Sequence, residues 1–284
     1  MIFKYVIQEV RLLKTFLYEQ QFSKKTISAI KENGALLVNG RSVTVRARLE
    51  EGDQLEVHLP LEVPSESLIP YEKPLNILFE DEWLLIVTKP TMQNSAPSRE
   101  HPHESLVEQA LNHMQQSGER GIPHIVTRLD RHTMGIVIFA KSRHLHHLMT
   151  QTSIDKIYEC ICKGTLKEQN EIVAPIARNQ NSIISRCVSP EGKYARTLYW
   201  PLKNFKTYTL CRVKLVTGRT HQIRVHFQHI GAPIVGDGLY GTPHALYTSQ
   251  LLKCAEVKFI HPITKVAVHV KATNPNFKKL LLTL

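Results

Sequence analysis

The 284-residue sequence has no long hydrophobic run and no segment typical of export. No uninterrupted apolar stretch approaches the roughly 20 residues that a membrane-spanning helix needs. The first residues, MIFKYVIQEVR, carry charges within their apolar stretch and contain no small-residue cleavage site. We therefore expect neither a membrane anchor nor a signal peptide, and a cytoplasmic protein.

Paired cysteines and the common cofactor motifs are also absent. The five cysteines are an odd number and include no Cys-x-x-Cys pair, so we expect reduced, packed thiols at Cys160, Cys162, Cys187, Cys211 and Cys254. The sequence has no GxxxxGK[ST], GxGxxG or HExxH motif, which predicts no cofactor. His144 and His147 share a helix face, but without a third ligand nearby we expect a solvated face and no metal.

Acidic residues are missing from one long stretch of a basic chain with a net charge of +11. Between Glu191 and Asp237 there is no Asp or Glu, whereas eight Lys and Arg residues occur there. A solvated face would normally mix both signs, so this stretch favours a surface for phosphates. A membrane surface is a poorer interpretation, because the sequence has no basic amphipathic helix with an aromatic apolar face. Nucleic acid is the better interpretation.

What is present divides the chain into a small module, a linker and a larger domain. In residues 1–60 two short helices, one of them from Lys24 to Glu32, precede a hairpin turn at Asn39-Gly40 and an alternating strand, QLEVHL. Residues 61–74 are rich in proline and polar residues, which is typical of a linker. The pattern FSKKTISAIKENGALLVNG…EEGDQLEV resembles a small RNA-binding module first seen in a small-subunit ribosomal protein.

Residues 75–284 predict a second domain with many strands and few helices. WLLIVTK and GIVIFAK have the composition of buried strands, and YTLCRVKLV and AVHVKA alternate. Ser105 and Glu108 form a capping-box pattern before a helix over about 105–117, and Ser142 is a cap for the next helix. We predict an α+β fold, with a mixed, mostly antiparallel β-sheet, flanking helices and the small N-terminal α+β module.

One carboxylate stands among cations in RLDRHTMG, residues 128–135. Asp130 lies between Arg128 and Arg131, in a loop that leads into the strand GIVIFAK. Scaffolds often place functional groups on such loops, although an Asx turn would explain the residue equally well.

Three further stretches change that balance: KIYECICKG, TGRTHQIRVHFQHIGAPIVGDGLYG and KFIHPIT. With RLDRHTMG they closely resemble the signature of RluA-type pseudouridine synthases, over about residues 75–284. The resemblance implies an RNA-modifying isomerase without a cofactor, and it makes Asp130 the catalytic carboxylate. It also maps two catalytic partners onto Tyr158 and Arg224, with Arg224 pairing with Asp130. Thr127, His132 and Met134 depart from the usual residues, and KPTMQNSAPS lacks the glycine of the usual K-P-x-G stretch.

The implied reaction explains the isolated carboxylate. Pseudouridine formation breaks the N1–C1′ bond of a uridine, turns the base and rejoins it through C5. Asp130 either attacks C1′ or removes the C2′ proton, and both roles need the ionised form, which neighbouring cations favour. The base must first leave its stack, at a cost of a few kcal/mol. Tyr158 is expected to stack on it and to take the C5 proton if close enough. The residues expected to contact RNA are Arg128, Arg131, Arg219, His221, Lys24, Lys25 and Arg41.

Alternatives remain open from the residues. A non-catalytic RNA-binding factor for ribosome assembly would use the same basic surface, and a hydrolytic nucleosidase would need a second carboxylate that is not found beside the motif. Structured ribosomal RNA is the expected substrate, with transfer RNA as the alternative. We expect a monomer, and expect Thr220 to cap a helix that turns Ile223, Phe227 and Ile230 inward.

Overall fold

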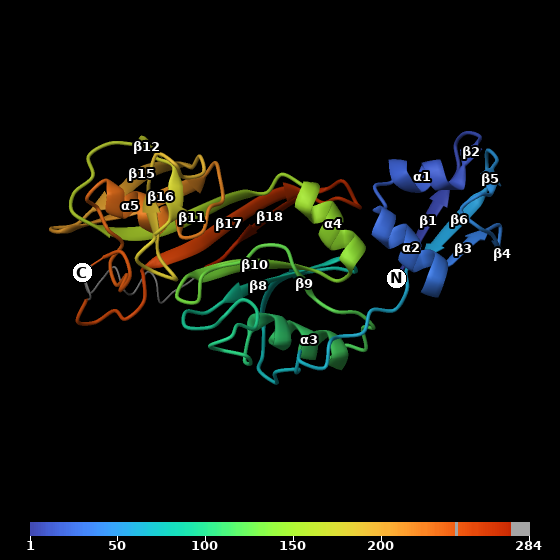
Figure 1. The fold of residues 1–284 in the computed structure, drawn as a ribbon, viewed down its shortest axis with the longest axis horizontal. Helices are drawn as coiled ribbons and strands as arrows, with labels where there is room; N and C mark the ends of the chain where they lie inside the picture. Colours follow the sequence, from blue (N-terminus) through green and yellow to red (C-terminus); the bar gives the residue numbers. More distant parts are fainter. Residues whose placement is uncertain (242–243, 274–284) are drawn as a thin grey trace.

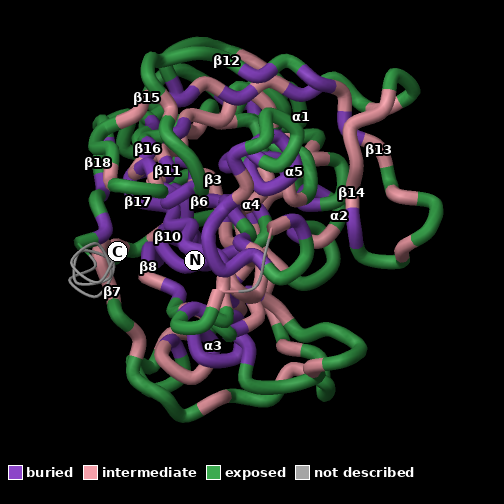
Figure 2. Tube along the Cα trace, turned by 90° about the vertical axis from the view of Figure 1, so that its left-hand side faces the viewer, coloured by how far each residue is buried: buried purple, intermediate pink, exposed green. Residues whose placement is uncertain are grey.

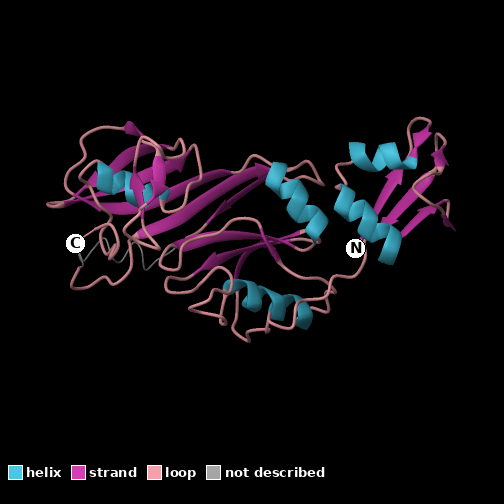
Figure 3. Ribbon diagram, viewed as in Figure 1, coloured by secondary structure: helices cyan, strands magenta, loops and turns pink. Residues whose placement is uncertain are grey.

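The computed structural model describes residues 1–241 and 244–273, which contain five helices and eighteen strands (Figures 1 and 3). The helices are α1 (Leu13–Glu19), α2 (Lys24–Asn33), α3 (Leu106–Gln116), α4 (Arg143–Gln151) and α5 (Gln222–His229). Within the described ranges, no helix has the length and apolar character required to cross a membrane.

The N-terminal residues build a sheet of their own. Its antiparallel order is β1 (Ile2–Val6), β6 (Gln54–His58), β3 (Ala35–Val38) and β4 (Arg41–Ser42), while β2 (Arg11–Leu12) pairs with β5 (Arg48–Leu49). Ser23 caps α2 by accepting a hydrogen bond from the Thr26 N–H, and Asn39 and Gly40 both adopt the positive φ of a tight hairpin turn. A separate apolar core lies beneath the two helices. We call residues 1–58 the N-terminal module.

The segment after this module is attached to the rest of the chain at several points. Residues 59–75 contain no helix or strand. The Glu62 carboxylate accepts hydrogen bonds from the His124 ring and the Arg143 N–H. Further along, the Tyr71 N–H donates to the Glu108 carbonyl, and the Gln109 amide donates to the Pro74 carbonyl. The proline-rich segment therefore lies along the larger domain.

The N-terminal module also packs against the larger domain through aromatic rings. Phe22 stacks on His144 of α4 with ring centroids 4.0 Å apart, and Phe3 contacts both His144 and Trp83. All of these rings except Trp83 are buried. The module therefore docks on the larger domain, although a linker rich in proline would allow the two to stand apart.

A ten-stranded sheet forms the larger domain. Its main path runs β12-β15-β16-β11-β17-β10-β8-β7, with β18 paired to β17 and β9 to β10. Among the described strands, only β10 and β17 pair in parallel, over Met134–Gly135. The predicted α+β fold with a mostly antiparallel sheet is therefore confirmed. The strands are β7 (Asn76–Glu80), β8 (Leu84–Lys89), β9 (His124–Ile125), β10 (Met134–Ala140), β11 (Asp155–Lys163), β12 (Asn170–Val173), β13 (Ile176–Arg178), β14 (Arg186–Val188), β15 (Arg196–Asn204), β16 (Tyr208–Leu215), β17 (Leu252–Ile260) and β18 (Ala267–Lys271).

Burial follows this central sheet. All seven residues of β10 are buried, and Figure 2 shows the purple, buried stretches concentrated on β8, β10, β17 and the inner helices. In Figure 1, α3 lies below the sheet, α4 lies beside the N-terminal module, and α5 lies at the opposite end. The hairpin β13–β14 projects from the body of the molecule in Figure 2.

Local expectations for α3 and α4 are met, but those for α5 are only partly met. Ser105 and Glu108 form a reciprocal capping box at α3, and Ser142 caps α4. The predicted cap of α5 is wrong: His221, not Thr220, stands at the N-cap, and it has a left-handed backbone. Ile223 and Phe227 are buried as expected, whereas Ile230 is exposed because the helix ends before it.

Candidate active site

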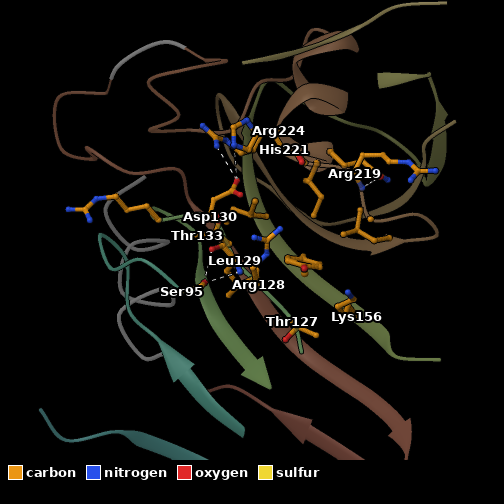
Figure 4. Close-up of a pocket in the computed structure, with 18 of the residues that line it drawn as sticks. Ser95, Thr127, Arg128, Leu129, Asp130, Thr133, Lys156, Arg219, His221 and Arg224 are labelled. Carbon is orange, nitrogen blue, oxygen red and sulfur yellow. Dashed lines mark hydrogen bonds and ion pairs between the residues drawn. The ribbon is translucent and has the colours of Figure 1, made fainter. Parts of the chain in front are cut away.

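The signature residues meet in a pocket of about 550 Å³ at the end of the sheet. The loop between β9 and β10 contributes Arg128, Asp130 and Arg131; β11 contributes Tyr158. The segment that leads into α5 contributes Arg219 and His221, and α5 itself contributes Arg224. In Figure 4, Asp130 points toward Arg224 and His221, while Arg219 and Lys156 lie across the pocket.

Asp130 pairs directly with Arg224, as the resemblance implied. Nη1 of Arg224 donates to Oδ2 of Asp130 at 3.1 Å, and Nε2 of His221 lies 3.8 Å from the same oxygen. About a third of the Asp130 side chain is exposed, whereas 8% of the Arg224 side chain is. The carboxylate therefore faces the open pocket while its cation lies behind it.

A second carboxylate holds that cation in place. Asp237 is fully buried and accepts two hydrogen bonds from Arg224, from Nε and Nη2, each 2.8 Å long. Burial alone would raise the pKa of Asp237, but the Arg224 guanidinium and the N–H groups of Leu239 and Tyr240 outweigh it and hold that pKa below its usual value. Because Nε and Nη2 are engaged, Arg224 presents Nη1 to Asp130.

Tyr158 reaches the pocket from an irregular point of β11. The pairing of β11 with β17 shifts register between Ile157 and Tyr158, and such bulges re-aim a side chain. Burial, followed by the nearby Cys254 and Asp130, raises the pKa of Tyr158 well above its usual value. The residue therefore offers a neutral phenol ring, which suits packing against a base better than proton removal.

Contacts from distant segments fix the Asp130 loop. The Ser95 hydroxyl donates to the Leu129 carbonyl at 2.8 Å and accepts from the Leu129 N–H at 3.1 Å. Nζ of Lys89 donates to the carbonyls of Arg131, Pro90 and Gln93. Burial lowers the pKa of Lys89 to about 7, yet three carbonyl acceptors satisfy every N–H of the charged ammonium. Asp130 thus lies between two residues whose backbone groups are held by these hydrogen bonds.

The departures from the usual signature have structural partners. Thr127 accepts a hydrogen bond from the Ile138 N–H through its hydroxyl, and the His132 ring contacts the Ser249 hydroxyl at 2.8 Å. Met134 is buried in a small cluster with Ile161 and Val235. Met92 stands where the glycine of K-P-x-G is usual and has a φ of 63°. None of the four removes Asp130 from the pocket.

The remaining predicted residues fall into two groups. Arg128 and Arg219 are exposed at the pocket, and Arg131 is half-buried there. Lys24, Lys25 and Arg41 are exposed on the N-terminal module and do not line it.

The histidine and cysteine expectations concern other parts of the fold. His144 is buried against Phe22, so it is not on a solvated face, and His147 remains half-buried nearby. Among the described residues, no group of three His, Cys, Asp or Glu side chains is placed to hold a metal ion. All five cysteines are free thiols, four of them buried.

Sequence reasoning missed Lys89, Ser95, Asp237 and Tyr240. Asp237 and Tyr240 are both part of the quoted stretch VGDGLYG, so the motif contained the signal, but nothing in it showed which side chain they contact. Lys89 and Ser95 lie in the quoted stretch KPTMQNSAPS, about 40 residues before Asp130, and only the fold brings them to its loop.

Comparison with known proteins settles the class. Residues 83–229 match the family model described as RNA pseudouridylate synthase. The chain belongs to the RNA pseudouridine synthase family. The uncharacterized RNA pseudouridine synthase YjbO of Bacillus subtilis is 38% identical over 93% of this chain and 95% of its own length. The ribosomal large subunit pseudouridine synthase D of Haemophilus ducreyi is 30% identical over 93% of this chain and 87% of its length.

A solved structure supports the fold. The human RNA Pseudouridylate Synthase Domain Containing 1 superposes with a TM-score of 0.59 at 20% identity, over 75% of this chain and 87% of that one. The resemblance to RluA-type synthases is thus confirmed, and the protein is an RNA-modifying isomerase. The resemblance of residues 1–60 to a ribosomal-protein module stays a prediction.

Proposed function

We propose that this protein isomerises specific uridines of ribosomal RNA, with Asp130 as the catalytic carboxylate. The observation that carries the proposal is the ion pair between Asp130 and Arg224, which is fixed from behind by Asp237 and opens into a 550 Å³ pocket. The buried Arg224 guanidinium places a charge of opposite sign directly beside the Asp130 carboxylate, where the uridine enters. The reaction needs the ionised carboxylate, whether Asp130 attacks C1′ or removes the C2′ proton.

The other pocket residues complete the reaction. The neutral ring of Tyr158 packs against the extruded uracil, and Arg128, Arg131 and Arg219 contact phosphates around it. Breakage of N1–C1′ leaves its electron pair on the base. After the base turns, C5 bonds to C1′ and the C5 proton leaves, so tritium release from [5-³H]uridine in RNA follows turnover.

Ribosomal RNA is favoured over transfer RNA by the relatives. Two proteins named ribosomal large subunit pseudouridine synthase D match this chain over 93% of its length, a share that includes most of the N-terminal module. We infer that the N-terminal module binds a second RNA segment through Lys24, Lys25 and Arg41. The proposal has the enzyme acting as a monomer in the cytoplasm, which gel filtration and cell fractionation test.

Pseudouridine mapping tests the substrate and the catalytic residue together. Cells that lack the gene should lose pseudouridine at defined ribosomal RNA positions and regain it with the wild-type gene but not with Asp130→Asn. That variant keeps the side-chain size and removes the charge, so RNA affinity should stay within a few-fold. Lost sites in transfer RNA alone would redirect the substrate, and more than a few percent of wild-type turnover by Asp130→Asn would refute the role of Asp130.

A further inference from the structure

His221 has a strained backbone beside Asp130. Its φ is 57°, a left-handed conformation that costs a non-glycine residue roughly 1–2 kcal/mol. It occupies the N-cap of α5, yet its side chain makes no capping hydrogen bond. Instead the ring extends into the pocket, where Nε2 lies 3.8 Å from Oδ2 of Asp130. Such strain is a common feature of residues that a site holds in place.

The other ring nitrogen of His221 contacts the hydroxyl of Tyr240, and this hydroxyl has a second hydrogen-bond partner. Nδ1 of His221 lies 2.8 Å from Oη of Tyr240, and the backbone N–H of Arg186 donates to that same Oη at 2.7 Å. The Arg186 N–H is a donor only, so it occupies an acceptor position of the phenol. The other partner of Oη among the described residues is Nδ1 of His221, so we infer that the single O–H of Tyr240 donates to that nitrogen.

Donation from Tyr240 indicates which nitrogen of His221 carries the hydrogen. A neutral imidazole has one N–H and one acceptor nitrogen, so acceptance at Nδ1 leaves the hydrogen on Nε2. Burial, the largest influence, together with nearby Arg224 and Arg186, lowers the pKa of His221 despite the opposing effect of Asp130 and Asp237. Burial also raises the pKa of Tyr240, which keeps its hydroxyl protonated.

Tyr240 is itself held by the group that fixes Arg224. The Tyr240 N–H donates to Oδ1 of Asp237 at 3.2 Å, and its ring lies 4.9 Å from the Arg224 guanidinium carbon. The segment from Asp237 to Tyr240 therefore orients both residues that flank Asp130. One of them, Arg224, supports the carboxylate, and the other, His221, directs an N–H toward the space in front of it.

We propose that the relay from Arg186 N–H through Tyr240 Oη–H to His221 Nδ1 fixes His221 as an Nε2–H donor to O2 of the departing uracil. The inference rests on the proposed role of Asp130. When N1–C1′ breaks, its electron pair is shared between N1 and the carbonyl oxygens of the base, whichever role Asp130 takes. O2 is the carbonyl oxygen beside the broken bond. His221 is then a catalytic residue, and Tyr240 is a positioning residue.

The tautomer is measurable without any turnover. Protein labelled with ¹⁵N-histidine should show His221 as a neutral imidazole with its hydrogen on Nε2. In Tyr240→Phe the relay is lost, so the Nδ1–H form should appear as well. A wild-type signal with the hydrogen on Nδ1 would overturn the proposal directly, even if the enzyme makes pseudouridine normally.

Single-turnover rates on saturating RNA test the donor. His221→Phe should lose about 100-fold, the scale on which removal of one donor to a developing charge acts. His221→Gln, which keeps an N–H donor near the Nε2 position, should recover part of that loss, and Tyr240→Phe should lose about tenfold. Equal rates for the Phe and Gln variants at position 221 would sink the donor role.

A matched control separates these effects from loss of packing. Tyr199 is another buried tyrosine, 7% exposed, that packs on Phe227 outside the pocket. Tyr199→Phe should keep both the wild-type rate and the His221 tautomer. If it slowed turnover as much as Tyr240→Phe, the relay would be refuted. Failure of the wild type to release tritium would count against the proposed function and leave the tautomer result standing.

Discussion

At the scale of single residues, one guanidinium connects the two carboxylates of the candidate active site through three hydrogen bonds. Arg224 donates hydrogen bonds to Asp237 from Nε and Nη2 and to Asp130 from Nη1. A lysine ammonium is a point charge on a flexible stem and cannot bridge two carboxylates in that geometry. Arg224→Lys should therefore lower the single-turnover rate by about 100-fold or more.

The control for this change is the same substitution at an ion pair away from the pocket. Arg212 of β16 donates to Glu256 at 3.0 Å and does not line the site. Arg212→Lys should leave the rate near that of the wild type. A near-normal rate in Arg224→Lys would mean that a single positive charge is enough behind Asp130.

At this scale the sequence predicted the residues that we propose to carry the chemistry, but not those that support them. Asp130, Tyr158 and Arg224 stand in short motifs, so each was assigned a role by resemblance, and the structure places all three at one pocket. Lys89 and Ser95 act through hydrogen bonds to the backbone of a loop far along the chain. Any polar residue of suitable length makes such bonds, so sequence alone does not distinguish them.

At the scale of elements, one connecting turn has a residue that does not suit its backbone conformation. In the turn after β8, Met92 has a φ of 63°, and the residue is 54% exposed, so it contributes little to the core. Glycine adopts this conformation without the roughly 1–2 kcal/mol that other residues pay, at an entropic cost of about 0.5–1 kcal/mol. Met92→Gly should raise the free energy of unfolding by up to about 1 kcal/mol.

Thermal unfolding checks this prediction. A gain of that size corresponds to about 2 °C in Tm for a chain of this length. Met92→Ala is the matched control, because it removes the exposed side chain but keeps the Cβ and the strain, and it should leave Tm unchanged. An equal rise in both variants would show that the side chain, not the backbone, is unfavourable.

The strand β10 shows why the positions of elements were easier to predict than the contacts between them. The apolar pattern GIVIFAK predicted β10, which is buried throughout. Its parallel pairing with β17 depends on Gly135, where a Cβ would meet the Cys254 carbonyl oxygen at 2.2 Å. The partner strand lies more than a hundred residues away, and local periodicity holds no information about it.

At the scale of the whole molecule, a buried histidine of the larger domain, His144, lies at its contact with the N-terminal module. Burial against Phe3 and Phe22, then the neighbouring His147, lowers the pKa of His144 to about 4. A histidine exposed by undocking takes up a proton near its usual pKa of about 6.5. The undocked state therefore binds more protons between about pH 6.5 and 4, so docking is strongest above that range and weakens as the pH falls through it.

Acidification should thus loosen the N-terminal module before the larger domain unfolds. The distance between labels on the two parts, followed by energy transfer from pH 7.5 to 4, measures this step. His144→Phe cannot be protonated and should move the step to lower pH or abolish it. An identical pH profile in wild type and His144→Phe would show that other groups control the docking.

Docking has a consequence for the proposed binding of a structured RNA. Because the N-terminal module packs on Trp83 and His144, its basic residues stand at a fixed position relative to Asp130. Two linked sites gain affinity only when the RNA presents both segments at a matching span. Changing Lys24, Lys25 and Arg41 together to alanine should therefore weaken binding to structured ribosomal RNA but not to a minimal stem-loop. If each residue contacts one phosphate, the slope of log affinity against log salt should fall by about 2–3 on the structured RNA.

A second triple variant removes the same charge from other points of the N-terminal module. Lys4, Arg46 and Arg48 are exposed, and alanine at all three lowers the net charge equally. If the Lys24, Lys25 and Arg41 surface binds RNA, this control should keep most of the affinity and the salt slope. Equal losses in both triple variants would mean that the module acts through its overall charge. Equal losses of affinity on both RNAs would instead refute binding of a second RNA segment, since a minimal stem-loop has no such segment.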